Sequence, residues 1–247
     1  MLTTLAATAV AIAQAAAPAT AASAPDGAAL AAAMRRAMQS DGFELRLTLR
    51  DPADGSSTPQ RIAIVGEFGA QRRRIALRGI APANIANRRY RAELGADARV
   101  RLLEPALADV QAPVWGSALV PWDLLGAWWD WPVQELGGAD QAAGHACRWL
   151  HSRPPAAAAG GGVTAVDSCI DAADGVALVT RCWGPRHRLL RSIEVTRLLR
   201  KSSGLAAAKS ALIRAADGTT TAIEVYDGDE HHAIVADDFD APTGARR

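Results

Sequence analysis

The chain has 247 residues, enough for one larger domain or two small ones, and its hydrophobic share of 49% and charged share of 21% are ordinary for a globular protein. Its formal net charge of +1 excludes the strongly basic or acidic composition that is typical of proteins that bind nucleic acids or charged membrane surfaces.

The first 24 residues, "MLTTLAATAVAIAQAAAPATAASA", contain no charged residue and are rich in small apolar side chains. They are too weakly hydrophobic for a membrane span, and Pro18 interrupts them. A secretory signal peptide over residues 1–24 fits better, although the basic start of such a peptide is missing, and the alternative is an unstructured alanine-rich tail. No cysteine lies near the expected cleavage site to take a lipid anchor. We therefore expect an exported, soluble periplasmic protein.

The N-terminal half predicts one helix followed by a meander of strands. Residues 26–39 show a helical pattern, because Leu30, Met34 and Met38 recur at every fourth position on one face. The stretch "GFELRLTLR" at residues 42–50 alternates apolar and polar residues, which indicates a strand with one wet face. Further strands are expected at residues 61–69, 72–80, 88–94 and 98–104.

The C-terminal half predicts a second run of short strands. Residues 187–199 are long enough for a bent strand or a helix. The other strands are expected at residues 144–152, 163–171, 175–183, 208–217, 219–227 and 231–239. Roughly ten strands with few helices and short connections predict a mainly β (α+β) fold, with a large antiparallel sheet in a single domain over residues 25–247.

The stretch "VWGSALVPWDLLGAWWDWP", residues 114–132, is the most unusual part of the chain, and we call it the tryptophan segment. It holds five of the seven tryptophans, and its only charged residues are Asp123 and Asp130. Pro121 suits the first turn of a helix, and Pro132 would end that helix. A helix that is apolar on every side has to be covered on every side. We therefore expect this segment, with the N-terminal helix, to cover the apolar face of the sheet.

Two interpretations of the tryptophan segment stay open. In one, the segment fills the concave side of the sheet as ordinary core. In the other, it covers the sheet incompletely and leaves an apolar cavity for a hydrophobic ligand. The residues expected to line or close that cavity are Trp122, Leu125, Trp128 and Trp129 in the segment, and Leu45, Leu47, Ile64 and Phe68 in the strands.

Three cysteines lie on predicted strands. If the strands that carry Cys147 and Cys169 form a hairpin, the two thiols come opposite each other, which favours a structural disulfide in an oxidising compartment. A Cys169–Cys182 pair, or three unpaired buried thiols, are the alternatives. Only His145 is close enough in sequence to activate Cys147, so catalysis by a thiol is not expected.

The remaining polar clusters are expected to be structural. Adjacent residues of a strand point to opposite faces, so His231 and His232 predict no metal site, and a hydrolase that uses either histidine is the least favoured alternative. Runs such as "QRRRIALR" and "GPRHRLLR" are expected to point alternate arginines into water, and the balancing acidic residues argue against nucleic-acid binding. If these arginines gathered at the mouth of a cavity, they would meet lipid phosphates or an acidic partner.

The order of these elements resembles that of the outer-membrane lipoprotein-sorting protein family, the LolA-like proteins. The chain carries a "GS-x-L" step and "DLL", then "G-x-x-C-x-W-L", "V-x-S-C-I-D" and "ALVTRCW", within about residues 43–240. The matched positions are Gly116, Ser117, Leu119, Asp123, Leu124, Gly144, Cys147, Leu150, Ile170 and Asp171. The "W-x-Y-x-P" strand that is frequent in this branch is absent, with "RRYRAEL" as the nearest approach. No single arginine can be matched to the ligand-gating arginine of the sorting carrier, so that role is not transferred.

The resemblance implies a half-open antiparallel β-barrel whose concave face is covered by helices. For this chain it implies a periplasmic, non-enzymatic carrier or binding protein for a lipid, a lipoprotein acyl chain or another hydrophobic ligand, with no cofactor and no metal. The expected partners are such ligands and membrane-associated envelope proteins, with no nucleic acid, and the oligomeric state is left open. The alternative is a protein-interaction or regulatory module of the cell envelope that has the same fold and a filled core.

Overall fold

The computed structural model describes residues 26–97, 99–105, 109–155, 162–171, 173–200 and 206–239. The signal peptide expected at residues 1–24 lies outside these ranges. Within them, no helix is both long enough and apolar enough to cross a membrane.

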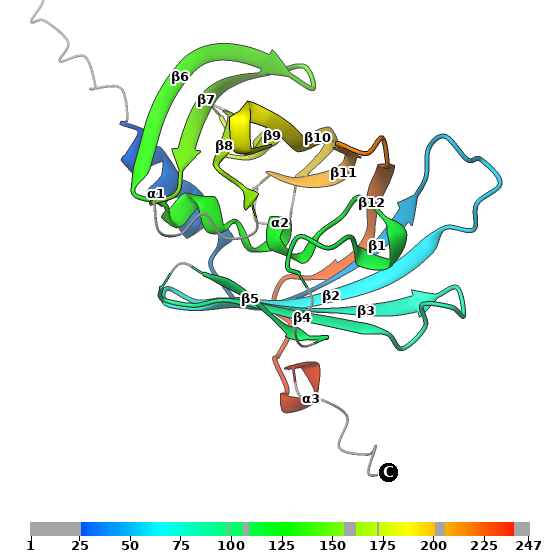
Figure 1. The fold of residues 1–247 in the computed structure, drawn as a ribbon. Coiled ribbons are helices and arrows are strands. Elements are labelled where there is room, and N and C mark those ends of the chain that lie inside the picture. Colours follow the sequence, from blue (N-terminus) through cyan, green and yellow to red (C-terminus); the bar gives the residue numbers. More distant parts are fainter. Residues whose placement is uncertain are drawn as a thin grey trace, which may run out of the picture.

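Strands make up most of the described chain (Figure 1). The first run of strands is β1 (Ser40–Arg50), β2 (Gln60–Phe68), β3 (Arg73–Ala81), β4 (Arg89–Leu94) and β5 (Val100–Glu104). The second run is β6 (Val133–Ala142), β7 (His145–Arg153), β8 (Ala165–Asp171), β9 (Ala177–Gly184), β10 (Arg188–Arg200), β11 (Ala206–Ala215) and β12 (Thr220–Asp229). The helices are α1 (Gly27–Met38), η1 (Val114–Gly116), α2 (Pro121–Leu125), η2 (Ala127–Asp130), η4 (Pro185–His187) and α3 (Ala236–Phe239).

The strands of the described residues form one antiparallel sheet of twelve strands, in the order β5-β4-β3-β2-β1-β12-β11-β10-β9-β8-β7-β6. Each run is a meander, and the pairing of β1 with β12 joins the two runs. The mainly β fold with one large antiparallel sheet is thus confirmed. Strands β5 and β6 are its two edges, so the sheet curves around α2 without closing into a barrel (Figure 1).

The C-terminal side of the sheet decides one open alternative and corrects one strand prediction. Of the strand and the helix that residues 187–199 allowed, the strand is present as β10, and His187 ends the short helix η4 before it. Residues 231–239, expected to be a strand, form a turn followed by the short helix α3. The Asp238 carboxylate accepts a hydrogen bond from the Val235 N–H at 2.9 Å and lies 3.2 Å from the His232 ring. This local acceptor competes with a strand ladder for the backbone donor.

Strand β6 was not predicted, and glycines explain why. Gly137 and Gly138 lie in its middle, where a bulge between Leu136 and Ala139 interrupts the alternation on which a strand prediction rests. A Cβ atom on Gly137 would lie only 2.5 Å from Nε2 of His151 on the neighbouring strand. The close approach of β7 therefore requires glycine at a position where the sequence pattern suggests a loop.

Helix α1 begins at an aspartate cap and packs against strand β6. The Ala29 N–H donates a hydrogen bond to the Asp26 carboxylate at 2.6 Å, which satisfies a backbone donor of the first turn. Ala31 and Met34 are buried on the inner face of the helix. A Cβ atom on Gly27 would lie 2.2 Å from the backbone oxygen of Gln134, so the helix backbone approaches β6 directly.

A disulfide joins Cys147 on β7 to Cys169 on β8, with a sequence separation of 22 residues. The two half-cystines and Leu178 form a small buried cluster that is separate from the main core. Cys182 is a free, buried thiol. The structure therefore contains the first of the two pairings that the sequence allowed, and the bond lies away from the tryptophan segment.

We predict that reduction of this disulfide lowers the free energy of unfolding by about 3 kcal/mol, because the bond restricts a loop of this length in the unfolded chain. Urea unfolding with and without reductant measures the loss. The Cys147→Ala/Cys169→Ala variant is the control and should unfold at the same urea concentration in both buffers. An unchanged midpoint for the native protein after complete reduction would contradict the prediction.

Candidate functional site

The tryptophan segment consists of three short helical pieces, not the single helix expected from Pro121 to Pro132. Helices α2 and η2 are separated by Gly126, which has a φ of 58°. A Cβ atom there would lie 2.8 Å from Cδ1 of Trp129 and 2.9 Å from Cε of Met38. Positive φ and close packing both favour glycine at this position, and the break lets the indoles on its two sides face one another.

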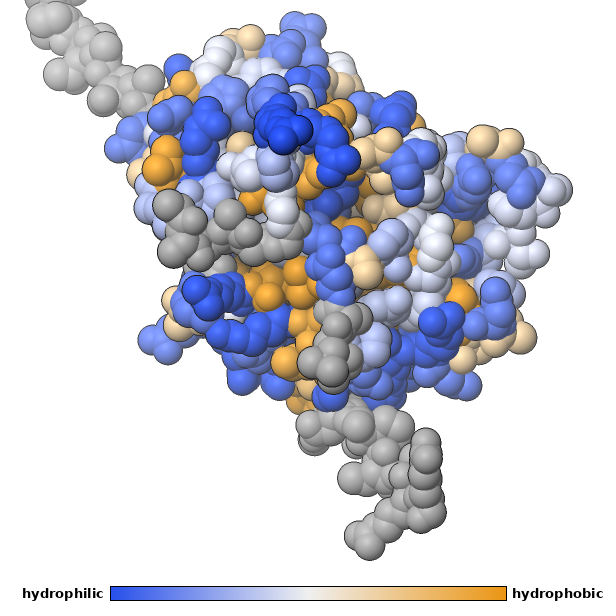
Figure 2. Space-filling model, in the orientation of Figure 1, coloured by the Kyte–Doolittle hydropathy of each residue, from blue (hydrophilic) through white to orange (hydrophobic). Residues whose placement is uncertain are grey.

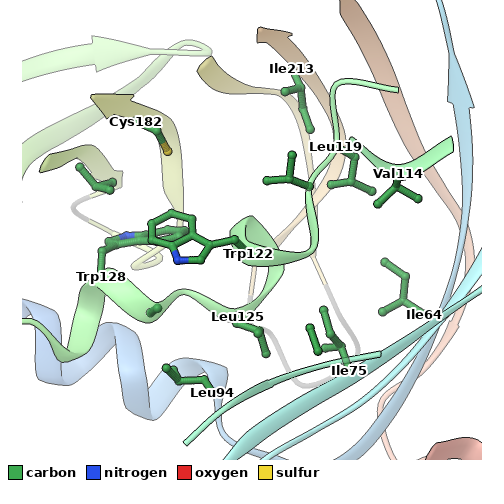
Figure 3. Close-up of a cluster of buried hydrophobic side chains, with 14 of the residues drawn as sticks. Ile64, Ile75, Leu94, Val114, Leu119, Trp122, Leu125, Trp128, Cys182 and Ile213 are labelled. Carbon is green, nitrogen blue, oxygen red and sulfur yellow. The ribbon is translucent and has the colours of Figure 1, made fainter. Parts of the chain in front are cut away.

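The indoles of the segment pack together inside the curved sheet (Figure 3). Trp122 and Trp128 lie with their ring centroids 5.1 Å apart, and Trp128 and Trp129 lie 5.2 Å apart. Ile75, from the strands below, lies beside Leu125 in the same view, and Ile64 points up toward Val114. The segment therefore occupies the concave side of the sheet, between the two runs of strands.

The first run of strands presents an apolar concave surface to the segment. Strand register places Leu45, Ile64, Leu77 and Tyr90 in one row across β1 to β4. A neighbouring row contains Phe43, Gly66, Ile75 and Ala92. A third row contains Phe68, Arg73 and Leu94, so a single arginine interrupts an otherwise apolar surface.

All eight residues that the sequence predicted for a ligand cavity belong to the cluster that forms the main core. Seven of them are buried, and Leu45 is partly buried against that cluster. The buried members are Leu47, Ile64, Phe68, Trp122, Leu125, Trp128 and Trp129. The structure thus brings the strand residues and the segment residues together, and indoles fill the space between them.

The first carboxylate of the segment forms a buried ion pair. Asp123 on α2 accepts hydrogen bonds from Nε of Arg191 on β10 at 2.8 and 2.7 Å, and from Nη2 of the same guanidinium. Only 2% of the Asp123 side chain and 6% of the Arg191 side chain are exposed. Burial raises the pKa of Asp123 above its ordinary value, and the positive charge of Arg191 opposes that shift. The Arg191 guanidinium also lies 5.5 Å from the centroid of the Trp122 ring.

The second carboxylate of the segment meets the arginine that interrupts the concave surface. Nη2 of Arg73 on β3 lies 2.8 Å from Asp130, and its Nη1 donates to the backbone oxygens of Leu125 and Gly126 at 2.8 and 3.1 Å. The Leu125 carbonyl lies at the C-terminus of α2, where a helix leaves its carbonyls without an intrahelical partner, and the Gly126 carbonyl also accepts from the Trp129 N–H at 3.1 Å. Burial lowers the pKa of Arg73 and raises the pKa of Asp130, and in each case the charge of the partner opposes the shift.

Four further side chains satisfy backbone groups of the segment. Gln134 donates to the oxygens of Trp128 and Trp131, and Arg35 on α1 donates to the oxygen of Trp129. Toward the start of the segment, Gln60 donates to the oxygen of Trp115, and Thr221 accepts from the Ala118 N–H at 2.8 Å. Because a buried backbone group without a partner is costly, these contacts allow an irregular segment to lie inside the sheet.

The inward arginines correct the expectation that strand arginines simply face water. In "QRRRIALR", Arg73 faces the core while Arg72 and Arg74 pair with Glu67 on the other side. In "GPRHRLLR", Arg191 is buried. The signal that could have found Arg73 and Arg191 is the presence of two carboxylates in an apolar segment, since each needs a buried cation.

The histidine cluster near the C-terminus shows no metal-binding geometry. His232 lies 3.2 Å from Asp238 and 3.8 Å from Glu44, and His231 is exposed. Across the described ranges, no three potential ligands among His, Cys, Asp and Glu gather closely enough to hold a metal ion.

Comparisons with solved structures show a shared fold at low sequence identity. A DUF1329 family protein from Desulfovibrio piger has a TM-score of 0.71 at 15% identity, over 87% of this chain and 95% of that one. A LolA superfamily protein from Nitrosomonas europaea has a TM-score of 0.64 at 10% identity, over 88% and 99%. A protein domain from Vibrio parahaemolyticus that is assigned to outer membrane lipoprotein sorting has a TM-score of 0.62 at 12% identity, over 85% and 94%.

These likenesses show that the chain has a LolA-like fold, as the sequence resemblance implied. No protein-family model and no curated protein sequence matches the chain. The assignment of the fold therefore rests on structural similarity to these solved proteins.

We predict strong coupling between Asp123 and Arg191. Arg191→Met should lower the free energy of unfolding by about 3–5 kcal/mol, because it leaves a buried carboxylate without its cation. The double variant Asp123→Ala/Arg191→Met buries no charge and should regain most of that loss. A double-mutant cycle of urea unfolding measures the coupling, and additive losses in the cycle would contradict it.

The loss in free energy of unfolding that Arg191→Met causes should also depend on pH. Without the arginine, burial alone keeps the pKa of Asp123 raised in the folded protein, whereas the unfolded chain ionises near the ordinary value of about 3.9. The folded variant therefore keeps a proton at pH values where the folded native protein has released it, so its deficit relative to the native protein should grow as the pH rises through the raised pKa of Asp123 in the native protein. Unfolding curves of both proteins between pH 3 and 7 test the sign, which a purely steric effect of methionine would not produce.

Proposed function

We propose that this protein is a non-enzymatic binding protein of the cell envelope that holds the acyl chain of a lipid or lipoprotein against the concave face of its sheet. In this proposal the tryptophan segment is the cover of that site, and its indoles occupy the space that the ligand would take. Lipoprotein sorting, which is the assignment of the Vibrio parahaemolyticus relative, is the activity of this kind that the fold suggests.

The attachment of the tryptophan segment is the observation that carries this proposal. Within the described residues, no backbone hydrogen bond joins the segment to any strand. Side chains hold it instead, chiefly through Arg73 and Arg191. The segment can therefore leave the concave face while every strand pairing of the sheet persists, and its departure would expose a large apolar surface.

Acyl-chain burial supplies much of the energy that such an exchange requires. Burial of hydrocarbon contributes about 0.8 kcal/mol per methylene, so a sixteen-carbon chain gains on the order of 12 kcal/mol before ordering costs. Indoles that move off the concave face become partly exposed to water. The acyl chain then covers the apolar strand residues that the indoles had covered. The exchange needs apolar area and a movable cover, and it needs no catalytic group.

An apolar seam marks where a ligand would enter. Figure 2 shows hydrophobic side chains at the surface between α2 and the strands below it. Partly buried residues of this region that pack against the main core are Val100, Leu102, Val110 and Leu124. Because β5 is an edge of the sheet, entry here requires no separation of strands.

A buried donor inside the cluster fits an acyl ligand that carries an ester or carboxyl group. The indole N–H of Trp128 is buried and has no hydrogen-bond acceptor among the described residues. Buried donors normally have a partner. An oxygen at the polar end of a bound acyl chain would supply the missing acceptor.

An extracytoplasmic location agrees with the chemistry of the chain. The Cys147–Cys169 bond is stable in an oxidising compartment such as the periplasm, and disulfides are rare in the cytosol. This supports export, and with it the sequence expectation of a signal peptide.

A second candidate function is a protein-interaction or regulatory module of the envelope. The observation that favours it is the filling of the concave side, where Leu125 and Trp129 are at most 2% exposed. In that case the segment is permanent core and the partner binds elsewhere on the surface. The two candidate functions differ in one testable respect: an acyl chain contacts the indoles of the segment in the carrier and never does so in the interaction module.

Fluorescence quenching by a brominated fatty acid tests that difference. In the Trp149→Phe/Trp183→Phe variant, all five remaining tryptophans lie in the segment. We predict that 9,10-dibromostearate quenches its emission in a saturable manner with one equivalent bound, because bromine quenches indoles only at short range. Titration with unbrominated stearate is the matched control and should bind without that quenching.

Native mass spectrometry of the delipidated protein with stearate gives the stoichiometry independently. Failure of both fatty acids to bind, with segment fluorescence unchanged, would contradict the carrier and leave the interaction module as the function of the fold.

A further inference from the structure

Two adjoining hollows lie at the edge of the tryptophan segment. The first, of about 160 Å³, is bounded by the last turns of α1 and the turn between β2 and β3, and Arg35, Arg36 and Arg73 line it. The second, of about 360 Å³, continues along the same turn to Arg72 and Leu94. Both include Arg73 and Asp130 in their walls, so they form one depression on either side of that ion pair.

The walls of this depression are strongly basic. Four arginines line the two hollows together, and Asp130 is their only acidic residue. Arg73 and Arg35 share Asp130, and Arg72 pairs with Glu67 and Glu93 at 3.4 and 3.9 Å. The guanidinium of Arg36 has no hydrogen-bond or ion-pair partner among the described residues. Arg35 and Arg36 in the last turn of α1 also offset the negative end of the helix dipole, but with Arg72 paired to glutamates, Asp130 still faces the three cations Arg35, Arg36 and Arg73.

The basic depression is continuous with the apolar site of the proposed function. Leu94 lines the second hollow and also belongs to the main core cluster. Arg73 lines both hollows and donates to the carbonyl of Leu125, at the end of α2. A molecule with its hydrocarbon under the segment would therefore place a polar end among these arginines.

Guanidinium groups bind phosphate well because their planar set of donors matches two phosphate oxygens at once. A phosphodiester with no compensating ammonium group retains its full negative charge in such a site. A neutral or zwitterionic headgroup gains less from the same arginines, so the depression should discriminate between lipids by charge.

We propose that this depression binds the anionic phosphate headgroup of the lipid whose acyl chain lies under the tryptophan segment. The proposal rests on the proposed function, since it assigns the polar end of the same ligand. It defines the substrate class as anionic phospholipids or phosphate-bearing lipid conjugates. Arg36 supplies the free cation, and Arg35 and Arg73 supply further donors as they exchange Asp130 for phosphate.

Calorimetric titration with two lysolipids that share one palmitoyl chain tests the headgroup assignment. Palmitoyl lysophosphatidylglycerol is anionic and palmitoyl lysophosphatidylcholine is zwitterionic, and both are used below their micelle concentrations. We expect the native protein to bind the anionic lysolipid about tenfold more tightly at low salt, and this preference should shrink as salt is added.

The variant Arg36→Gln should reduce the preference to about threefold or less, and its urea midpoint should stay unchanged because Arg36 is exposed and unpaired. Arg78→Gln is the matched control, since Arg78 is an exposed arginine on β3 outside both hollows. That control should keep the full preference.

Three other results would each overturn the proposal. Equal binding of the two lysolipids rejects the headgroup site and leaves the acyl-chain function intact. Inorganic phosphate that binds as tightly as the anionic lysolipid, with the same dependence on Arg36, identifies free phosphate as the ligand. Binding of neither lysolipid rejects both the headgroup site and the acyl-chain site on which it rests.

Discussion

Burial of an ionised carboxylate is costly unless a cation accompanies it, and the tryptophan segment carries one buried and one partly buried carboxylate. Asp123 is met by Arg191 from the second run of strands, and Asp130 is met by Arg73 from the first. Among the described strands, the two runs pair with each other through β1 and β12 alone. The ion pairs therefore connect the segment to both sides of the concavity, so that the charge balance of the segment also fixes its position.

The rest of the interior follows from the shape of the sheet. A twelve-strand sheet that curves but does not close leaves an apolar concave face, and some other element has to cover it. Five indoles on a short stretch provide that area without a long helix, and the break at Gly126 allows Trp128 and Trp129 to turn back toward Trp122. Irregular backbone inside a protein then requires side-chain partners, which Arg73, Gln134 and other polar side chains supply.

Sequence patterns predicted most of the sheet because alternation is strong where one face is buried, as in Leu45, Leu47 and Leu49 on β1. They missed β6, whose glycines serve close packing against β7, and they assigned a strand at residues 231–239, where Asp238 captures backbone donors. The eight apolar residues predicted for the cavity do gather in one cluster. The inward direction of Arg73 and Arg191 was not readable from a run of arginines, since a one-residue change of register reverses which of them faces the core. Pairing across the sheet, which is a tertiary property, decides it.

The two ion pairs of the segment are not equivalent, and under the proposed function the difference would give the cover a direction of opening. The Asp123 side chain is 2% exposed and has one cation, whereas 27% of the Asp130 side chain is exposed and two arginines approach it. Separation of the buried pair leaves an uncompensated charge in the core, but water or an anion can replace a partner at the exposed end. The basic depression lies at that same end, beside Asp130. Movement of η2 away from the sheet therefore costs less than movement of α2, so in the proposed carrier η2 is the end that opens while α2 stays paired with Arg191.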